Sequence, residues 1–314
     1  MRPRADATKY PGERPAHPAF VIGGHALAAP RLSAGLYLVA TPIGNLGDVT
    51  IRALETLAGA DLIACEDTRV TRKLLDRFHI TTQLSPYHDH NAATVRPRLI
   101  EKLAAGAAIA LVSDAGTPLI SDPGFKLVRE ASRAGIVVSA VPGASSVLAA
   151  LCLAGLPTDR FFFEGFLPAR SVARRARIKE LARIEATLVL FETGPRIAAA
   201  LADLSGELGD RDAAICREMT KLHEQVERSG LAGLAARADS LETRGEFVVV
   251  IGPPAPADTA MTDSDLDRAL KAAMAGSSLK DAVAEVAEIS GRARREVYAR
   301  ALALTRQGKR DGKD

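Results

Sequence analysis

Short apolar runs alternate with amphipathic stretches from residue 36 onward. Continuous apolar runs bounded by turn residues are typical of buried strands, and spacings of three and four residues between apolar positions are typical of helices. This alternation predicts a mainly parallel sheet with helices on both faces. The expected strands are Leu36–Thr41, Asp61–Cys65, Ala108–Val112 and Ile136–Val141, and the expected helices are Thr50–Leu57, Val70–Phe78, Ala92–Leu103 and Phe125–Ala134.

The alternation starts again after a helix expected at Ala144–Leu156. We therefore place a domain boundary near Pro157 and expect two α/β domains, residues 34–157 and 158–252. In the second domain the expected strands are Phe161–Glu164, Thr187–Phe191, Ala213–Arg217 and Phe247–Ile251, and the expected helices are Ser171–Arg183, Pro195–Leu204 and Leu231–Ala238.

The two ends of the chain differ from this pattern. Residues 1–33 contain scattered prolines and charges with little periodicity, which predicts a disordered tail. A proline-rich linker is expected at residues 253–261, followed by a small helical module at residues 262–314. Within that module Ser278 and Asp281 have the spacing of a capping box, and Gly291 interrupts the apolar pattern. This arrangement predicts a helical hairpin or a helix-turn-helix-like unit.

Composition narrows the class of protein. The chain has 314 residues, of which 47% are hydrophobic and 25% are charged, as in an ordinary soluble globular protein. No apolar run approaches the roughly 20 residues of a membrane-spanning helix. Cys65, Cys152 and Cys216 lie far apart without metal-ligand spacing, so we expect reduced thiols in a cytoplasmic protein and neither a disulfide framework nor a metal site.

Turn-rich polar segments follow several of the expected strands, where open α/β sheets bind ligands. Ser113–Gly124 contains two prolines, two glycines and two aspartates, and we favour a functional role for Asp114. Asp122 is better interpreted as a turn or cap residue. Thr41–Asp48 has neither the GxGxxG nor the P-loop pattern. Taken alone, it is better interpreted as a tight loop than as a binding site.

Three further segments leave two interpretations open. Val141–Ser146 combines small residues with serines that can cap a helix or bind a ligand. Glu66–Arg69 can bind a polar substrate or form its own ion-pair network. Arg217–Gln225 is dense in polar side chains for a simple turn, and Lys221 or Glu224 could assist proton transfer.

Two stretches are strongly basic although the whole chain carries a net charge of only +3. Arg170–Arg183 has five arginines and one lysine against one glutamate, and Arg292–Arg310 has six arginines and one lysine against one glutamate. Such runs are usually solvated helix faces, but two of one sign also suit contacts with an RNA backbone. Aromatic residues are only 4% of the chain and tryptophan is absent, which argues against a stacking platform for single strands.

The combination of these motifs resembles the tetrapyrrole methylase family of S-adenosylmethionine-dependent enzymes, and within it the branch that methylates ribosomal RNA on ribose. The resemblance runs from about Leu36 to Gly252. The segments that carry it are LYLVATPIGNLGDVTIRALETL, IACEDTRVTRKLL, LVSDAGTPLISDPG, VPGASS, LPTDRFFFEGFLP, LFETGPRI, REMTKLHE and GEFVVVIG.

The resemblance implies two Rossmann-like α/β domains with S-adenosylmethionine in the cleft between them. Tetrapyrrole enzymes carry a Gly-Asp-Pro loop where this chain has Ser113–Pro118, and this departure favours the RNA branch. The cofactor-binding residues that the resemblance implies are Pro42, Asp114, Thr117, Pro118, Leu119, Ile120, Ala144, Ser145, Ser146, Leu167 and Phe247.

The implied reaction is methyl transfer to a cytidine 2′-hydroxyl of 16S ribosomal RNA near the decoding centre. The acceptor hydroxyl must lose a proton, and the candidates to accept or assist are Asp67, Glu66, Lys221 and Glu224. The RNA of the small ribosomal subunit would be held by Arg174, Arg175, Arg177 and Lys179, and family members act as homodimers.

Two other functions remain open at this point. A tetrapyrrole methyltransferase of the precorrin type would not need two arginine-rich helices for a small anionic substrate. A non-catalytic RNA-binding assembly factor would not need the Asp114 loop and would not bind S-adenosylmethionine.

Overall fold

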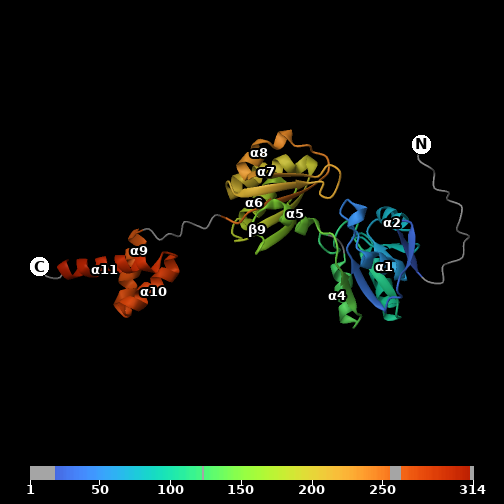
Figure 1. Ribbon diagram of the computed structural model, residues 1–314, viewed down its shortest axis with the longest axis horizontal. Helices are drawn as coiled ribbons and strands as arrows, with labels where there is room; N and C mark the ends of the chain where they lie inside the picture. The colour runs from blue at the N-terminus through green and yellow to red at the C-terminus, as the bar shows by residue number, and fades with distance from the viewer. Residues whose placement is uncertain (1–17, 122–123, 255–262, 312–314) are drawn as a thin grey trace, which may run out of the picture. The chain divides into compact units, whose positions relative to one another are not determined.

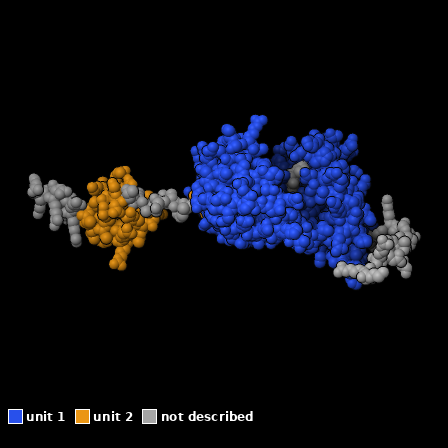
Figure 2. Space-filling model, turned by 90° about the horizontal axis from the view of Figure 1, so that it is seen from above, with its two compact units in different colours: residues 1–252 blue, residues 253–314 orange. Residues whose placement is uncertain are grey.

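The computed structural model describes residues 18–121, 124–254 and 263–311, with side chains described as far as Thr305. The chain divides into two compact units, residues 1–252 and 253–314 (Figure 2). The first unit contains two lobes, each built around a five-stranded sheet. We call residues 18–141 the first lobe and residues 146–252 the second lobe.

The sheet of the first lobe is entirely parallel, as its continuous apolar strands predict. Its strand order is β5-β4-β6-β3-β7. Helices α1 and α2 pack on one face and helices α3 and α4 on the other. The elements are β3 (Gly35–Val39), the 3₁₀ turn η1 (Leu46–Asp48), α1 (Ile51–Gly59), β4 (Leu62–Cys65), α2 (Thr68–Arg77), β5 (Leu84–Pro86), α3 (Ala92–Ala104), β6 (Ala108–Val112), α4 (Phe125–Arg133) and β7 (Val138–Val141).

The sheet of the second lobe is mixed, with strand order β11-β10-β12-β9-β8. Only β8 and β9 are parallel, and the other neighbours are antiparallel. The α/β class is therefore confirmed in both lobes, while the second sheet departs from a parallel Rossmann-like arrangement. The elements are α5 (Ser146–Ala154), β8 (Phe161–Phe166), α6 (Ser171–Leu181), β9 (Thr187–Thr193), α7 (Gly194–Leu208), β10 (Asp212–Arg217), β11 (Gln225–Gly230), α8 (Leu231–Ala236), η2 (Ala238–Ser240) and β12 (Glu246–Ile251).

Helix α5 packs against the second sheet, although the sequence analysis placed it before the boundary at Pro157. Val147, Ala150 and Leu151 share one apolar cluster with Val189 and Val250 of the second sheet. Figure 1 shows α5 beside the strands of this lobe. Helices α6, α7 and α8 cover the opposite face. In spatial terms the second lobe therefore begins near Ser146, because the apolar face of α5 finds its partners there.

The prediction of a disordered tail over residues 1–33 is wrong for residues 18–33, and residues 1–17 lie outside the described part. Strands β1 (Ala19–Ile22) and β2 (His25–Ala28) form an antiparallel hairpin in which Phe20 is opposite Leu27. Phe20 is 1% exposed and belongs to the same core cluster as Leu54 and Leu57 of α1. The burial of one large side chain, together with a hydrogen bond from Val21 N to Phe78 O at 2.8 Å, orders this segment.

The second unit is a three-helix module made of α9 (Asp263–Gly276), α10 (Leu279–Ser290) and α11 (Arg294–Asp311). Its core contains Leu266, Leu270, Val283, Val286, Val297 and Ala301. The predicted cap of α10 is present, because the Asp281 backbone N–H donates to Ser278 Oγ at 3.3 Å. Gly291 ends α10 in the left-handed conformation, with φ of 64°. Among the described residues, no helix is long and apolar enough to cross a membrane.

Candidate functional site

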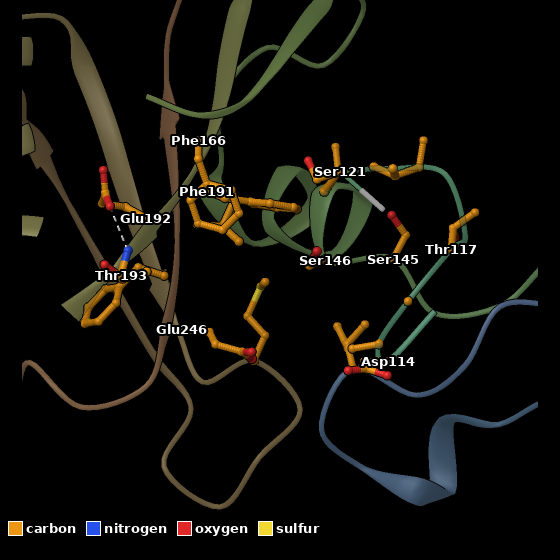
Figure 3. A pocket seen from close by; sticks show the side chains of 18 of the residues that line it. Asp114, Thr117, Ser121, Ser145, Ser146, Phe166, Phe191, Glu192, Thr193 and Glu246 are labelled. Carbon is orange, nitrogen blue, oxygen red and sulfur yellow. Dashed lines mark hydrogen bonds between the residues drawn. The ribbon is translucent and has the colours of Figure 1, made fainter. Parts of the chain in front are cut away.

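A cavity of about 390 Å³ lies within the first unit and is lined by residues of both lobes (Figure 3). Strands β3 and β6 are parallel neighbours, so the loops that follow them meet at one edge of the sheet. The first lobe contributes Ile43, Glu66 and the loop from Asp114 to Ser121. The second lobe contributes Ser146, Val147, Phe166, Phe191, Glu192, Thr193, Met219, Gly245, Glu246, Phe247 and Val248, and Ser145 lies in the connection between the lobes.

The backbone of the first-lobe loops is held in an unusual conformation. Thr41 and Gly116 exchange backbone hydrogen bonds of 2.9 and 3.0 Å, which join the loops after β3 and β6. Leu119 and Ser121 have φ values of 77° and 64°, a region that side chains other than glycine rarely adopt. In the second lobe Thr220, beside the lining residue Met219, has φ of 66°. Such backbone conformations cluster at functional sites.

The lining of the cavity is electrically one-sided. Four carboxylates line it, those of Glu66, Asp114, Glu192 and Glu246, and none of the described lining residues is lysine, arginine or histidine. Glu192 is only 3% exposed. Its Oε1 accepts from the Thr193 N–H at 2.9 Å and lies 3.1 Å from Arg196 Nε. Its Oε2 is buried without a hydrogen-bond partner in the described part of the chain. The cavity therefore suits a cation or a ligand rich in hydrogen-bond donors.

Aromatic rings bound the second-lobe side of the cavity. The Phe191 ring contacts those of Phe163 and Phe166 edge to face, with centroid distances of 4.9 and 5.6 Å. Phe166 remains 51% exposed, although large apolar side chains are usually covered. Phe247 lines the cavity and is otherwise buried. A planar apolar group can pack against these rings while polar atoms reach the carboxylates.

Lys221 connects the second lobe with the loop after β3. Its Nζ lies 2.9 Å from both Glu218 Oε1 and Glu246 Oε2. Burial alone would lower the pKa of Lys221, but the hydrogen bonds to the two carboxylates outweigh burial and raise this pKa. A Cβ on Gly44 would lie 2.5 Å from Cγ of Lys221, so the lysine stem requires glycine there. Lys221 therefore acts as an ion-paired cation and not as a proton acceptor.

Asp67 is also engaged elsewhere. Its carboxylate accepts from the backbone N–H of Arg69 at 2.8 Å, which caps α2, and from the guanidinium of Arg69 at 2.6 Å. These hydrogen bonds lower the pKa of Asp67 to about 2. The backbone N–H of Asp67 in turn donates to Asp114 Oδ1 at 2.9 Å. Asp67 thus orients Asp114 but is a weak base.

The structure brings together some of the residues named from the sequence and not others. Of the proposed cofactor-binding residues, those that line the cavity are Asp114, Thr117, Ile120, Ser145, Ser146 and Phe247, whereas Pro42, Pro118, Leu119, Ala144 and Leu167 do not. Leu167 is buried in the core beneath α6 and α7. The Ala144 carbonyl accepts from the Thr117 hydroxyl at 3.3 Å, so Ala144 supports the lining residue. The Leu119 side chain packs onto the core of the first lobe.

Among the four proposed proton-transfer residues, Glu66 lines the cavity and the others do not. Glu224 accepts from the Thr220 N–H at 2.6 Å and thereby shapes the loop beside Met219. The sequence analysis missed Ile43, Ser121, Phe191, Glu192, Thr193 and Met219 as cavity residues. Glu192 carries a signal that could have been noticed, because it is an acidic residue at the end of an otherwise apolar strand.

The basic helix α6 differs from its expected role. Arg174 is 5% exposed and forms an ion pair of 2.7 Å with Asp203 of α7, so its side chain is not available to an RNA, contrary to the prediction. Arg175 and Lys179 both face Glu207, at 2.6 and 3.7 Å. Arg177 is paired with Glu164 and Glu180. These acidic partners lie on α7, on β8 or one turn away on α6. They balance much of the positive charge of α6.

The fold and the cavity define a two-lobed α/β protein with a ligand site at the strand ends. Comparison of the sequence with known families matches residues 35–235 to the Tetrapyrrole (Corrin/Porphyrin) Methylases and residues 260–305 to the RsmI C-terminal HTH domain. The chain belongs to the tetrapyrrole methylase family, and it is an S-adenosylmethionine-dependent methyltransferase of that family.

Named relatives agree with this assignment, and a solved structure shares the fold. A protein of Mesorhizobium japonicum named ribosomal RNA small subunit methyltransferase I is 46% identical, over 90% of this chain and 97% of its own length. A protein of the same name from Synechocystis is 46% identical over 87% of this chain and 99% of its length. The fold is similar to that of a diphthine synthase, with a TM-score of 0.54 and 21% identity over 69% of this chain and 89% of that structure.

Proposed function

We propose that this protein transfers a methyl group from S-adenosylmethionine to the ribose 2′-hydroxyl of a cytidine in 16S ribosomal RNA, near the decoding centre of the small subunit. The names of the curated relatives support a small-subunit RNA substrate. The observation that carries the proposal is the cavity at the strand ends, with four carboxylates around an apolar wall.

The lining residues fit the donor. S-adenosylmethionine supplies an activated methyl group on a positively charged sulfur. Asp114, Glu192 and Glu246 line the space for a cationic ligand, and the cations that pair with Glu192 and Glu246, Arg196 and Lys221, do not line it. The buried Oε2 of Glu192 can accept a hydrogen bond from an ammonium or hydroxyl group. Phe166 and Phe191 offer aromatic faces and edges to a purine ring.

The protein's main task in such a transfer is alignment and exclusion of water. The loop from Asp114 to Ser121 and the start of α5 hold the ligand from one side, and Phe247 and Val248 hold it from the other. Reaction of a cation with a neutral hydroxyl spreads charge, so the apolar lining favours it. Holding the reacting atoms in line supplies a large share of the rate gain.

We propose Glu66 as the group that accepts the proton of the ribose hydroxyl. Glu66 lines the cavity at the end of β4. The other candidates, Asp67, Lys221 and Glu224, do not line the cavity. Proton transfer to a positioned carboxylate contributes about 10² to 10⁴ in rate.

The RNA substrate is preferred over a tetrapyrrole. The solved tetrapyrrole methyltransferases that share the fold are about 20% identical and support the fold alone. A polycarboxylate acceptor requires cations, and the cavity offers carboxylates. An assembly factor without catalysis would not require this cavity. We further propose a cytoplasmic homodimer in which the second unit, similar to the RsmI C-terminal HTH domain, contacts the subunit.

Methyl mapping tests the proposal directly. Small ribosomal subunits purified from a strain that lacks the protein are incubated with the protein and S-adenosylmethionine, and the 16S RNA is digested for mass spectrometry. We expect one added methyl group on the ribose of one cytidine, absent before incubation. A methyl group on a base, or no transfer to the subunit, contradicts the proposal.

A further inference from the structure

A second hollow of about 440 Å³ adjoins the cavity at the end of β4. Its lining residues are Glu66, Asp67, Thr68, Arg69, Pro86, His88, His90 and Asp114. Glu66 and Asp114 line both spaces, so the two are neighbours across these carboxylates. We call this second space the side hollow. Neither His88 nor His90 has a role in the cavity itself.

The polar side chains that line the side hollow differ in their exposure to solvent. Glu66, Asp67 and Asp114 are half-buried, whereas Arg69 and His90 are exposed. The side chain of Arg69 is 86% exposed and is held by Asp67 through two guanidinium nitrogens. Hydrogen-bond acceptors therefore lie deeper in the hollow, and a fixed cation lies at its rim.

The loop that carries the two histidines is held in place by its own sequence. The His88 N–H donates to Asn91 Oδ1 at 2.9 Å, and Asn91 Nδ2 donates to Pro86 O at 3.0 Å. The His88 and His90 rings meet edge to face with centroids 6.0 Å apart. Nδ1 of His88 is buried without a hydrogen-bond partner in the described residues. An ordered imidazole pair offers ring faces and edges to a ligand with aromatic parts.

We propose that the side hollow binds the acceptor nucleotide of the RNA, turned out of its helix. Ribose hydroxyls and an exocyclic amine donate hydrogen bonds to carboxylates such as Glu66 and Asp114. The base packs against the imidazole of His90, and the guanidinium of Arg69 contacts a flanking phosphate. The acceptor hydroxyl then lies at the carboxylates shared with the cavity. This inference rests on the proposed function, because it assigns the acceptor part of the same reaction.

The arrangement of charge favours a nucleotide over other acceptors. A polycarboxylate would meet three carboxylates and a single arginine in the hollow. In a nucleotide, by contrast, the hydrogen-bond donors of the base and ribose lie apart from the anionic phosphate. In the side hollow the half-buried carboxylates likewise lie deeper than the exposed guanidinium of Arg69 at the rim. RNA-binding proteins use histidine and arginine planes in this way for single unstacked bases.

Two substitutions at the rim test the inference, Arg69→Ala and His90→Ala. The full-length protein is assayed with S-adenosylmethionine and small subunits that lack the modification. We expect the KM for subunits to rise about tenfold in each variant, the loss that follows from about 1.4 kcal/mol of stacking or ion-pair contact. The Kd for S-adenosylmethionine, measured by calorimetry, is expected to stay within about twofold because neither residue lines the cavity.

Matched controls lie outside the side hollow. Arg72→Ala removes an exposed arginine from the same helix, and His25→Ala removes an exposed histidine from β2. Arg69→Lys keeps the charge but loses the two-pronged contact, so we expect an intermediate KM. A KM equal to that of the controls overturns the inference, and so does a parallel loss of donor affinity.

Ultraviolet crosslinking separates this inference from the proposed function. Subunits are irradiated with the unmodified protein, and crosslinked peptides are identified by mass spectrometry. A nucleotide on peptides containing residues 66–69 or 86–90 supports the side hollow even if no methyl group is transferred. Crosslinks confined to other segments overturn it even if the wild-type protein is active.

Discussion

Glu66 and Asp67 are adjacent acidic residues with different surroundings. Glu66 lines both the cavity and the side hollow, whereas Asp67 caps α2 and is bound by Arg69. The identity of a residue therefore does not decide its role here. The partners that the loop after β4 brings to each carboxylate decide it.

The pH dependence of the reaction distinguishes these two carboxylates. Because Arg69 lowers the pKa of Asp67 to about 2, this carboxylate is ionised above that value and loses its charge only as the pH falls through it. Asp67→Asn is therefore expected to keep the shape of the pH–rate profile between about pH 5 and 9. Glu66→Gln is expected to lower kcat by about a hundredfold or more.

Initial rates under saturating donor and subunits measure both effects. The two variants are closely matched, since each replaces an acid by its amide at neighbouring positions. Full activity in Glu66→Gln would contradict its role as the base, and loss of the pH dependence in Asp67→Asn would assign the titrating role to Asp67.

At the scale of single elements, the N-terminal hairpin has the clearest energetic consequence. Phe20 is fully buried against α1, and its cross-strand partner Leu27 is 41% exposed. Phe20→Ala is expected to lower the free energy of unfolding of the first unit by about 3 kcal/mol. Leu27→Ala is expected to change it by less than about 0.5 kcal/mol.

Scanning calorimetry and hydrogen exchange check this prediction. Exchange should become faster in residues 19–28 of the Phe20 variant, because the hairpin loses its anchor. Equal stability of the two variants would mean that the hairpin contributes nothing to the core.

The central elements could be predicted from the sequence and the edge elements could not. Strands such as β6, whose five residues are all buried, are recognisable from their continuous apolar sequence. Strand β11 was missed because it lies at the edge of the sheet with one face exposed to solvent. Such a strand carries polar residues, and its sequence QVERSG has no continuous apolar run. The antiparallel direction of β10 and β12 was missed because strand composition does not record direction. The hairpin of β1 and β2 was missed because the prolines that precede and follow it suggested disorder.

The site was predictable only in part, for a similar reason. Asp114 and Ser145 follow strands as polar residues in turn-rich loops, and these were identified. Phe191 belongs to β9, whose apolar sequence predicts a buried strand. That Phe191 lines a cavity depends on the position of the first lobe, which the sequence of β9 does not reveal. Arg174 was misjudged because a charge run on one helix does not reveal Asp203 on the next.

At the scale of the whole molecule, we expect the two units to have separate roles. The cavity and the side hollow are formed by residues of the first unit, and the second unit has its own core. In α11 the residues Arg294 and Arg295 are exposed, and we propose that they contact the RNA backbone.

A chain that ends at Gly252 tests this division. We expect it to bind S-adenosylmethionine with a Kd within about twofold of the full-length value, and to show a KM for small subunits raised by about tenfold or more. Full-length protein with Arg294→Glu and Arg295→Glu is the companion variant and should change in the same direction. Weaker donor binding in the shortened chain would mean that the second unit supports the first.

The one-sided lining of the cavity has a consequence for turnover. Under the proposed function, the ligand enters with a positive sulfur and leaves as an uncharged thioether. Asp114 faces the cavity, and Glu192 and Glu246 line it although Arg196 and Lys221 pair with them, so the lining favours the first form over the second. The lining therefore favours departure of the spent product over departure of the donor.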